Sequence, residues 1–158
     1  MENSCSFLSI VGGQCGHDRR DRNRAKECIP LLSCQRDVTG HKAMFAFYGI
    51  DNEVELILAR ASIFFFPRNI DQMTVCPAHR ASLSIGWTRR VPDKCKVPSI
   101  LSHHSGDISK RPKAGRGLSK ADSYAVLQET GVFLAVDSGL YSLKYKYQYC
   151  CYSRRKCQ

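Results

Sequence analysis

The sequence predicts an α+β fold in which two main helices pack on a short antiparallel sheet, with a zinc-stabilised loop region. Three observations support this prediction. Apolar residues from 54 to 65 recur at intervals of three and four, which is typical of a buried helical face. A second helix is delimited by Ser119 and Gly131. Residues 141–150 alternate large apolar side chains with polar or small ones, which is the period of a β-strand.

The first helix has a clear start and stop in the sequence. Asp51 or Asn52 can cap its N-terminus, and Glu53 and Glu55 follow in the first turn, where the helix dipole favours acidic side chains. Pro67 cannot continue a helix and is expected to end it. The apolar face is wide, so we expect this helix to anchor the core.

The second helix begins at Ser119, with Asp122 in the position of a capping-box acid, and ends before Gly131. A hairpin is expected over residues 132–149, with an aromatic and a polar face. A further strand is expected over residues 45–50.

The length and composition of the chain are those of one domain with flexible ends. A chain of 158 residues that is 43% hydrophobic can bury a core. We expect a flexible N-terminal tail over residues 1–27, a single zinc-organised domain over residues 28–149 and a basic C-terminal tail over residues 150–158. No apolar run approaches the length of a membrane span. Glu2 stands where a secretory signal carries basic residues, so we expect an intracellular protein, nuclear or cytoplasmic.

The segment around Cys76 carries the most specific chemistry. Cys76 and His79 are separated by two residues, a spacing that lets a thiolate and an imidazole reach one metal ion. Pro77 favours the first position of a short helix over residues 77–84. We predict one structural zinc ion with the ligands Cys76, His79, Cys95 and His103.

Other ligand sets remain open, because nine cysteines are present and clustered thiols in a reducing compartment are more often ligands than disulfides. One alternative combines Cys28 and Cys34 with Cys76 and His79. Another completes the site with Cys150, Cys151 or Cys157. Without a metal, these cysteines would be small buried apolar residues.

Positive charge is concentrated in the C-terminal half. The net charge is +10, and residues 80–120 hold ten lysines and arginines against two aspartates, which leaves +8 in that segment. Such asymmetry predicts an anionic partner, and nucleic acid is the first candidate. The predicted phosphate contacts are Arg89, Arg90, Lys110, Arg111, Lys113 and Arg116. An arm in which Arg19, Arg20, Arg22 and Arg24 touch phosphates is a less favoured interpretation, because Asp18, Asp21 and Glu27 dilute the charge of that segment.

Three functions are therefore under consideration. The favoured one is a small basic zinc-binding module that binds nucleic acid, with a regulatory role. The second is a protein-interaction adaptor with a purely structural zinc, in which the same bases contact an acidic partner. The third is a thiol- or metal-dependent enzyme. It is disfavoured because no metal-hydrolase motif or phosphate-binding glycine loop is present. We infer no small-molecule substrate.

Overall fold

The computed structural model of the chain describes residues 4–45, 49–89, 94–102 and 104–141. These residues contain five α-helices: α1 Phe7–Val11, α2 Thr39–Phe45, α3 Glu53–Arg60, α4 Pro77–Leu83 and α5 Lys120–Thr130. They also contain four short strands: β1 Ile29–Pro30, β2 Thr74–Val75, β3 Arg116–Gly117 and β4 Gly139–Leu140. The strands form two antiparallel pairs, β1 with β2 and β3 with β4. The predicted α+β class is therefore confirmed in this coarse form.

The chain divides into two compact units. The first unit comprises Met1–Lys42 and Gly49–Trp87, and the second comprises Ala43–Tyr48 and Thr88–Gln158. We had predicted one domain over residues 28–149 between two tails. Residues 142–158, which include the predicted C-terminal tail, lie outside the described residues.

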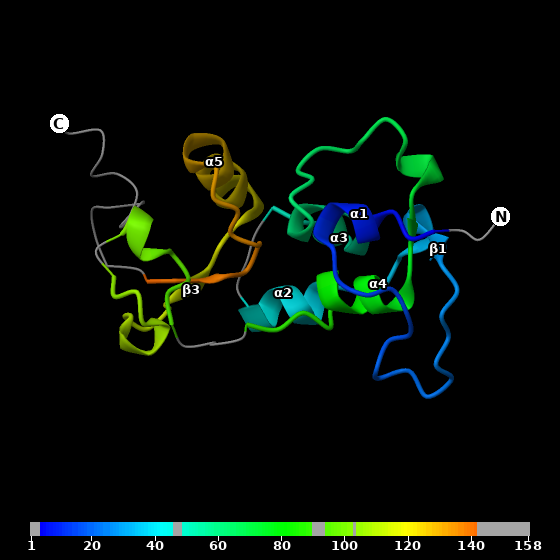
Figure 1. The fold of residues 1–158 in the computed structure, drawn as a ribbon, viewed down its shortest axis with the longest axis horizontal. Helices are drawn as coiled ribbons and strands as arrows, with labels where there is room; N and C mark the ends of the chain where they lie inside the picture. Colours follow the sequence, from blue (N-terminus) through cyan, green and yellow to red (C-terminus); the bar gives the residue numbers. More distant parts are fainter. Residues whose placement is uncertain (1–3, 46–48, 90–93, 103, 142–158) are drawn as a thin grey trace. The chain divides into compact units, whose positions relative to one another are not determined.

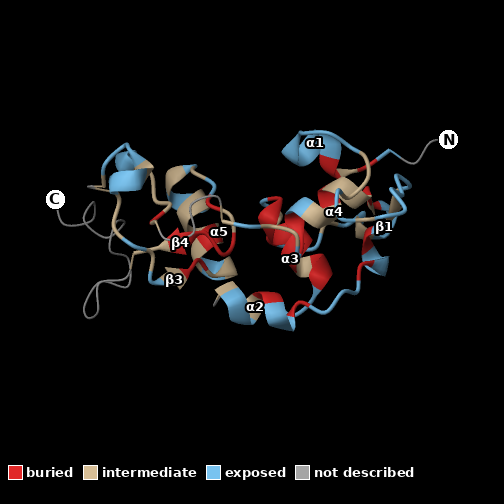
Figure 2. Cartoon of the chain, turned by 90° about the horizontal axis from the view of Figure 1, so that it is seen from below, coloured by how far each residue is buried: buried red, intermediate tan, exposed pale blue. Residues whose placement is uncertain are grey.

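The first unit is built around α3, in which every residue except Glu55 is buried or nearly so (Figure 2). Its N-cap is Asn52, whose Oδ1 accepts a hydrogen bond from the Glu55 amide at 3.0 Å. The remaining core residues come from the N-terminal segment, β1, β2 and α4. The buried cluster consists of Cys5, Phe7, Leu31, Cys34, Val54, Ile57, Leu58, Ala61, Met73, Val75, Cys76 and Leu83.

Helix α3 ends earlier than its apolar periodicity predicts. Ser62 adopts a positive φ of 63°, its amide donates to Ala59 O, and the Ile63 amide donates to Leu58 O at 2.8 Å. This is a Schellman C-cap with serine in the position that glycine usually occupies. Phe65 is therefore not on a helical face, and it is 70% exposed.

The N-terminal segment, expected to be a tail, is part of this core. Phe7 is fully buried, and the Ser6 amide donates to Thr74 O at 2.9 Å while the Thr74 amide donates to Ser6 Oγ at 3.0 Å. These two hydrogen bonds attach residue 6 to β2. From α1 the chain runs through a long loop to β1, drawn in blue in Figure 1.

In the second unit, α5 follows the predicted boundaries. Ser119 Oγ accepts from the Asp122 amide at 3.1 Å, and Gly131 is left-handed at φ 71°. Of the segment expected as a hairpin, the structure describes residues 132–141, in which β4 pairs with β3 and Gly139 faces Gly117. Residues 132–136 lack strand structure, and the tyrosine-rich segment lies outside the described residues.

The segment expected as a strand over residues 45–50 also differs. Phe45 is the last residue of α2, and residues 46–48 are not described. Within the described residues, the longest helix, α5, has 11 residues, and none of the helices there combines the length and hydropathy of a membrane span.

Candidate metal centre

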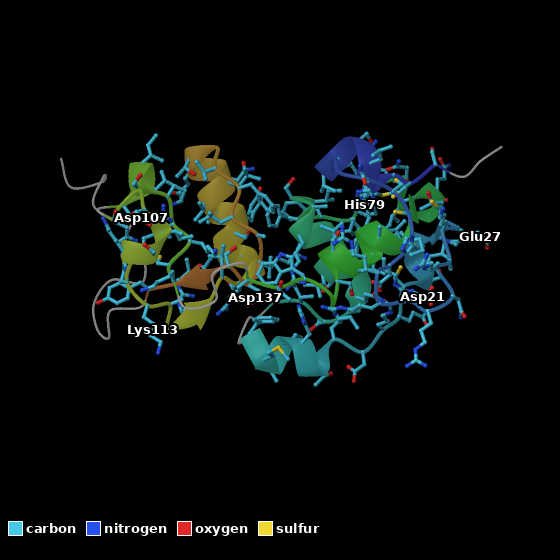
Figure 3. All side chains as sticks on the ribbon, turned by 60° about the horizontal axis from the view of Figure 1, so that its bottom comes forward. Asp21, Glu27, His79, Asp107, Lys113 and Asp137 are labelled. Carbon is cyan, nitrogen blue, oxygen red and sulfur yellow. The ribbon has the colours of Figure 1, made fainter. Side chains whose placement is uncertain are left out.

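Four side chains of the first unit bring potential ligand atoms together: Cys5, Cys15, Cys76 and His79. We call this set the Cys3His cluster. All four ligand atoms lie within 4.8 Å of one another. Figure 3 labels His79 and draws sulfur in yellow, so the thiols beside the imidazole can be followed there. Three of the four residues are buried, and Cys15 is exposed.

The distances from His79 Nδ1 to the three sulfur atoms are compatible with binding to one metal ion. His79 Nδ1 lies 3.1 Å from Cys76 Sγ, 3.4 Å from Cys5 Sγ and 3.7 Å from Cys15 Sγ. With zinc–sulfur bonds of about 2.3 Å and a zinc–nitrogen bond of about 2.0 Å, tetrahedral angles place nitrogen and sulfur ligands about 3.5 Å apart. The three observed distances bracket this value.

The second ring nitrogen of His79 fixes the tautomer. Nε2 lies 2.8 Å from the carbonyl oxygen of Gly12, an acceptor, so Nε2 carries the proton and donates it. Nδ1, the other ring nitrogen, faces the three sulfur atoms. Histidines that bind metals in proteins usually donate their other ring N–H to such an oxygen.

Helix α4 positions two of the ligands. Cys76 is the N-cap residue, and its Sγ accepts from the His79 amide at 3.4 Å. The Cys76 amide in turn donates to Cys5 Sγ at 3.3 Å. Amide hydrogen bonds of this kind stabilise negative charge on sulfur.

A buried ion pair fixes α4 against α3. Arg80, which directly follows His79, donates from Nε and Nη2 to the two carboxylate oxygens of Glu53 at 2.9 and 2.7 Å. Glu53 is fully buried and also accepts from Ser84 Oγ and the Arg36 amide. Bidentate pairs of this kind restrict orientation as well as position. The pair therefore fixes α4, which carries His79, against α3.

Glycine residues let the chain return to α4 with Cys15. Gly12 and Gly13 have φ values of 70° and 87°, which side chains other than glycine rarely adopt. The Ala78 amide then donates to Gly16 O at 3.1 Å, which holds the backbone after Cys15 against the first turn of α4.

Burial and hydrogen bonding oppose each other at the thiols. Burial raises the pKa of Cys76, but the backbone amides of His79 and Gly16, together with the His79 and Cys5 side chains, lower it to about 7. At Cys15, desolvation of the thiol, followed by the hydrogen bond and charge of Cys76 and the effect of Cys5, raises the pKa to about 12. Ionisation of one thiol therefore opposes ionisation of its neighbour, and a divalent cation would offset that opposition.

The predicted ligands have different locations. Cys76 and His79 are both in the cluster. Cys95 is buried in the second unit and is not among the four grouped residues, and His103 lies outside the described residues. The predicted set of four as a whole thus stays a prediction.

The ligands of the alternative sets also lie in different parts of the chain. Cys34 is buried in the hydrophobic core and is not one of the four grouped residues. Cys28 lies at the edge of the same core, where burial and then the charges of Cys5 and Cys76 raise its pKa. The three C-terminal cysteines lie outside the described residues.

Sequence reasoning missed Cys5 and Cys15, because we treated the first 27 residues as a tail. They are 74 and 64 residues from His79, so no local spacing connects them to it. The available signal was the run from Gly12 to Gly16, in which glycines surround a cysteine and allow a tight return of the chain.

Three of the predicted phosphate-contacting arginines make contacts inside the second unit. Arg89 donates to Asp137 Oδ1 at 2.8 Å, to Asp137 O and to Phe45 O. Arg111 donates to the carbonyl oxygens of residues 95, 97 and 105. Arg116 pairs with Asp122 at 3.2 Å.

The other three predicted contacts differ from these arginines. Lys113 is exposed, and Lys110 is 74% exposed with a loose 3.8 Å pairing to Asp107. Arg90 lies outside the described residues. Within this set, the two lysines are exposed without a close ion pair, and the side chain of Arg116 is 40% exposed although it pairs with Asp122.

Comparison with known proteins identifies no relative: no family model, no curated protein and no solved structure matches the chain. Any statement about function therefore depends on the chemistry of these residues.

Proposed function

We propose that Cys5, Cys15, Cys76 and His79 bind one zinc ion as a structural site. The observation that carries the proposal is the placement of His79, whose Nδ1 faces three sulfur atoms while its Nε2 donates to Gly12 O. Three thiolates and one imidazole form a donor set that suits zinc. Four protein ligands complete a tetrahedron, which is the pattern of a structural rather than a catalytic site.

A structural ion has a clear task in the first unit. Helix α1 has five residues, and β1 and β2 have two each, so regular hydrogen bonding contributes little to order there. A bound zinc would link the N-terminal segment to α4 across more than 60 residues of chain. The free energy of metal binding would thereby contribute to folding.

We further propose that this zinc-binding module binds nucleic acid and has a regulatory role. Support comes from the net charge of +10 and from exposed basic side chains in both units. Free thiols in the described residues support a reducing compartment, nuclear or cytoplasmic. An adaptor that binds an acidic protein is the competing proposal.

Elemental analysis of protein purified without added metal tests the zinc site. We expect about one zinc per chain. Cys15→Ser changes an exposed residue and should lose the zinc, whereas Cys95→Ser should retain it. Replacement of zinc by cobalt gives a second readout, because three thiolate ligands produce strong sulfur-to-cobalt charge-transfer absorption. Loss of zinc from Cys95→Ser with retention in Cys15→Ser would contradict the proposed ligand set.

Fluorescence anisotropy across a salt series tests the partner. Labelled single-stranded RNA, duplex DNA and a polyglutamate peptide are compared with the full zinc-loaded chain. We expect nucleic acid to bind more tightly than the peptide, with affinity that falls linearly with the logarithm of salt concentration. Negligible binding of both nucleic acids at low salt would reject this function, and preference for the peptide would favour the adaptor.

A further inference from the structure

We propose that residues 17–27 are the nucleic-acid contact surface, held at one end by the zinc site and at the other by β1. We call this segment the basic loop. The inference rests on the proposed nucleic-acid function and assigns the surface that performs it. The predicted contacts in residues 89–116 lie elsewhere in the chain, so the two assignments can be separated by experiment.

Both ends of the basic loop are attached to the same frame. Cys15, a proposed ligand, comes two residues before it, and Gly16 O accepts from the Ala78 amide on α4. At the other end Ile29 pairs with Val75 on β2, directly before Cys76. Figure 1 shows the loop extending between these attachments, beyond α4 and β1. Fixed ends reduce the conformational entropy that a loop loses when it binds a partner.

The basic side chains of the loop are accessible to a phosphate group. All five are exposed: Arg19, Arg20, Arg22, Arg24 and Lys26. Within the described residues none of them forms an ion pair or donates a side-chain hydrogen bond. Arg89, Arg111 and Arg116, in contrast, already donate to oxygen atoms of the protein. A guanidinium without an internal acceptor can bind a phosphate in bidentate fashion.

The acidic residues of the loop shape its backbone. Asp18 Oδ1 accepts from the Arg20 amide at 2.9 Å, and Asp21 accepts from the amides of Asn23 and Ala25 at 2.9 and 3.2 Å. These contacts form Asx turns, and two backbone turns close over residues 18–21 and 21–24. Figure 3 labels Asp21 and Glu27 in this segment. The aspartates lower the net charge but pair with none of the five bases.

The composition of the loop favours nucleic acid over a membrane or a protein partner. Ala25 is its only aliphatic residue, and the loop has no aromatic residue apart from His17. Stable anchoring of a surface segment in a membrane usually combines basic residues with apolar ones, and the energetic centres of protein interfaces are enriched in aromatic residues as well as arginine. Contacts to a phosphate backbone need only charge and hydrogen-bond donors.

The test compares two variants of the full zinc-loaded chain. Arg19→Gln/Arg22→Gln/Arg24→Gln neutralises the basic loop, and Lys110→Gln/Lys113→Gln is the control with exposed charges outside it. The loop variant should bind labelled single-stranded RNA at least about tenfold more weakly at low salt, and the slope against log salt should become shallower by about two. The control should change by less than about threefold.

The outcomes distinguish this inference from the function it rests on. If the loop variant binds like the wild type and the lysine control weakens, the loop assignment is overturned while nucleic-acid binding stands. If the wild-type chain binds neither RNA nor DNA, both proposals fail.

Zinc content and circular dichroism establish that each variant is folded. Ultraviolet crosslinking of RNA to the wild-type chain gives a readout that needs no variant. Crosslinked peptides should contain residues 17–27, and crosslinks confined to other segments would overturn the proposal.

Discussion

The two units of this chain obtain their order from different chemistry. The first unit has a hydrophobic cluster and a set of soft ligands, in which Cys76 and His79 meet Cys5 and Cys15. The first unit also has a buried ion pair, between Glu53 and Arg80, whereas the described part of the second unit has polar contacts of this kind without such a group of potential metal ligands. Arg89 pairs with the fully buried Asp137, and Arg111 donates to three carbonyl oxygens.

The difference shows two ways to compensate for short secondary structure. In the first unit a metal ion would join segments that are distant in sequence. The free energy of that binding would depend on the protonation of the ligands and on the metal concentration. In the second unit, guanidinium groups satisfy loop carbonyls that no strand or helix pairs. Removal of the metal should therefore lower the stability of the first unit, and loss of one buried charge should lower the stability of the second.

Metal removal should have the largest effect and should separate the two units. The binding free energy of structural zinc in small domains is about 10–16 kcal/mol, so a chelator should remove much of the order in the first unit. Hydrogen exchange read by mass spectrometry should show lost protection at the amides of Leu31 and Ala78. The amides of Ser123 and Asp137 should change less. Equal loss in both units would refute the comparison.

Asp137→Asn should lower the free energy of unfolding of the second unit by about 3–5 kcal/mol. The substitution leaves the Arg89 charge without its carboxylate, and asparagine tolerates the positive φ of 78° at this position. Denaturant titration measures the loss, and zinc content should not change. Asp122→Asn is the control, since the partly exposed Arg116–Asp122 pair should be worth less than about 1 kcal/mol.

Acid should weaken the first unit through His41. Burial, and then the Arg60 charge, lower the pKa of this imidazole to about 4 from an ordinary value of 6.5. The contribution is present above pH 6.5 and is lost as pH falls toward 4, by at most about 3 kcal/mol. His41→Gln keeps an acceptor for Arg60 and should lack this loss. The two proteins are compared by urea titration at each pH, and parallel curves would exclude His41 as the cause.

Ser119→Ala should have the smallest effect, about 1 kcal/mol in the stability of the second unit. The hydroxyl caps α5 by accepting from the Asp122 amide. Ser119→Thr keeps a capping oxygen and serves as the matched control in thermal unfolding. An alanine variant as stable as the threonine variant would show that the cap contributes nothing measurable.

Local signals predicted the starts of α3, α4 and α5, because capping depends on neighbouring residues, but they predicted neither α1 nor α2. Asn52, Cys76 and Ser119 each cap the helix that the sequence placed after them. The end of α3 was wrong because Ser62 takes a left-handed conformation without a glycine signal, and the apolar pattern continues past it. The short strands were missed because two-residue pairings have no periodicity.

By itself, the sequence determined the α+β class, the helix boundaries set by caps, the Cys76–His79 pair and the excess of positive charge. The tertiary structure alone decided that Cys5 and Cys15 are the thiols beside that pair. It also decided that Arg89 faces a buried carboxylate while the arginines of the basic loop remain accessible. The physical reason is range: caps and charges depend on residues a few positions apart. Ligand sets and ion pairs depend on how the chain packs across more than 40 residues.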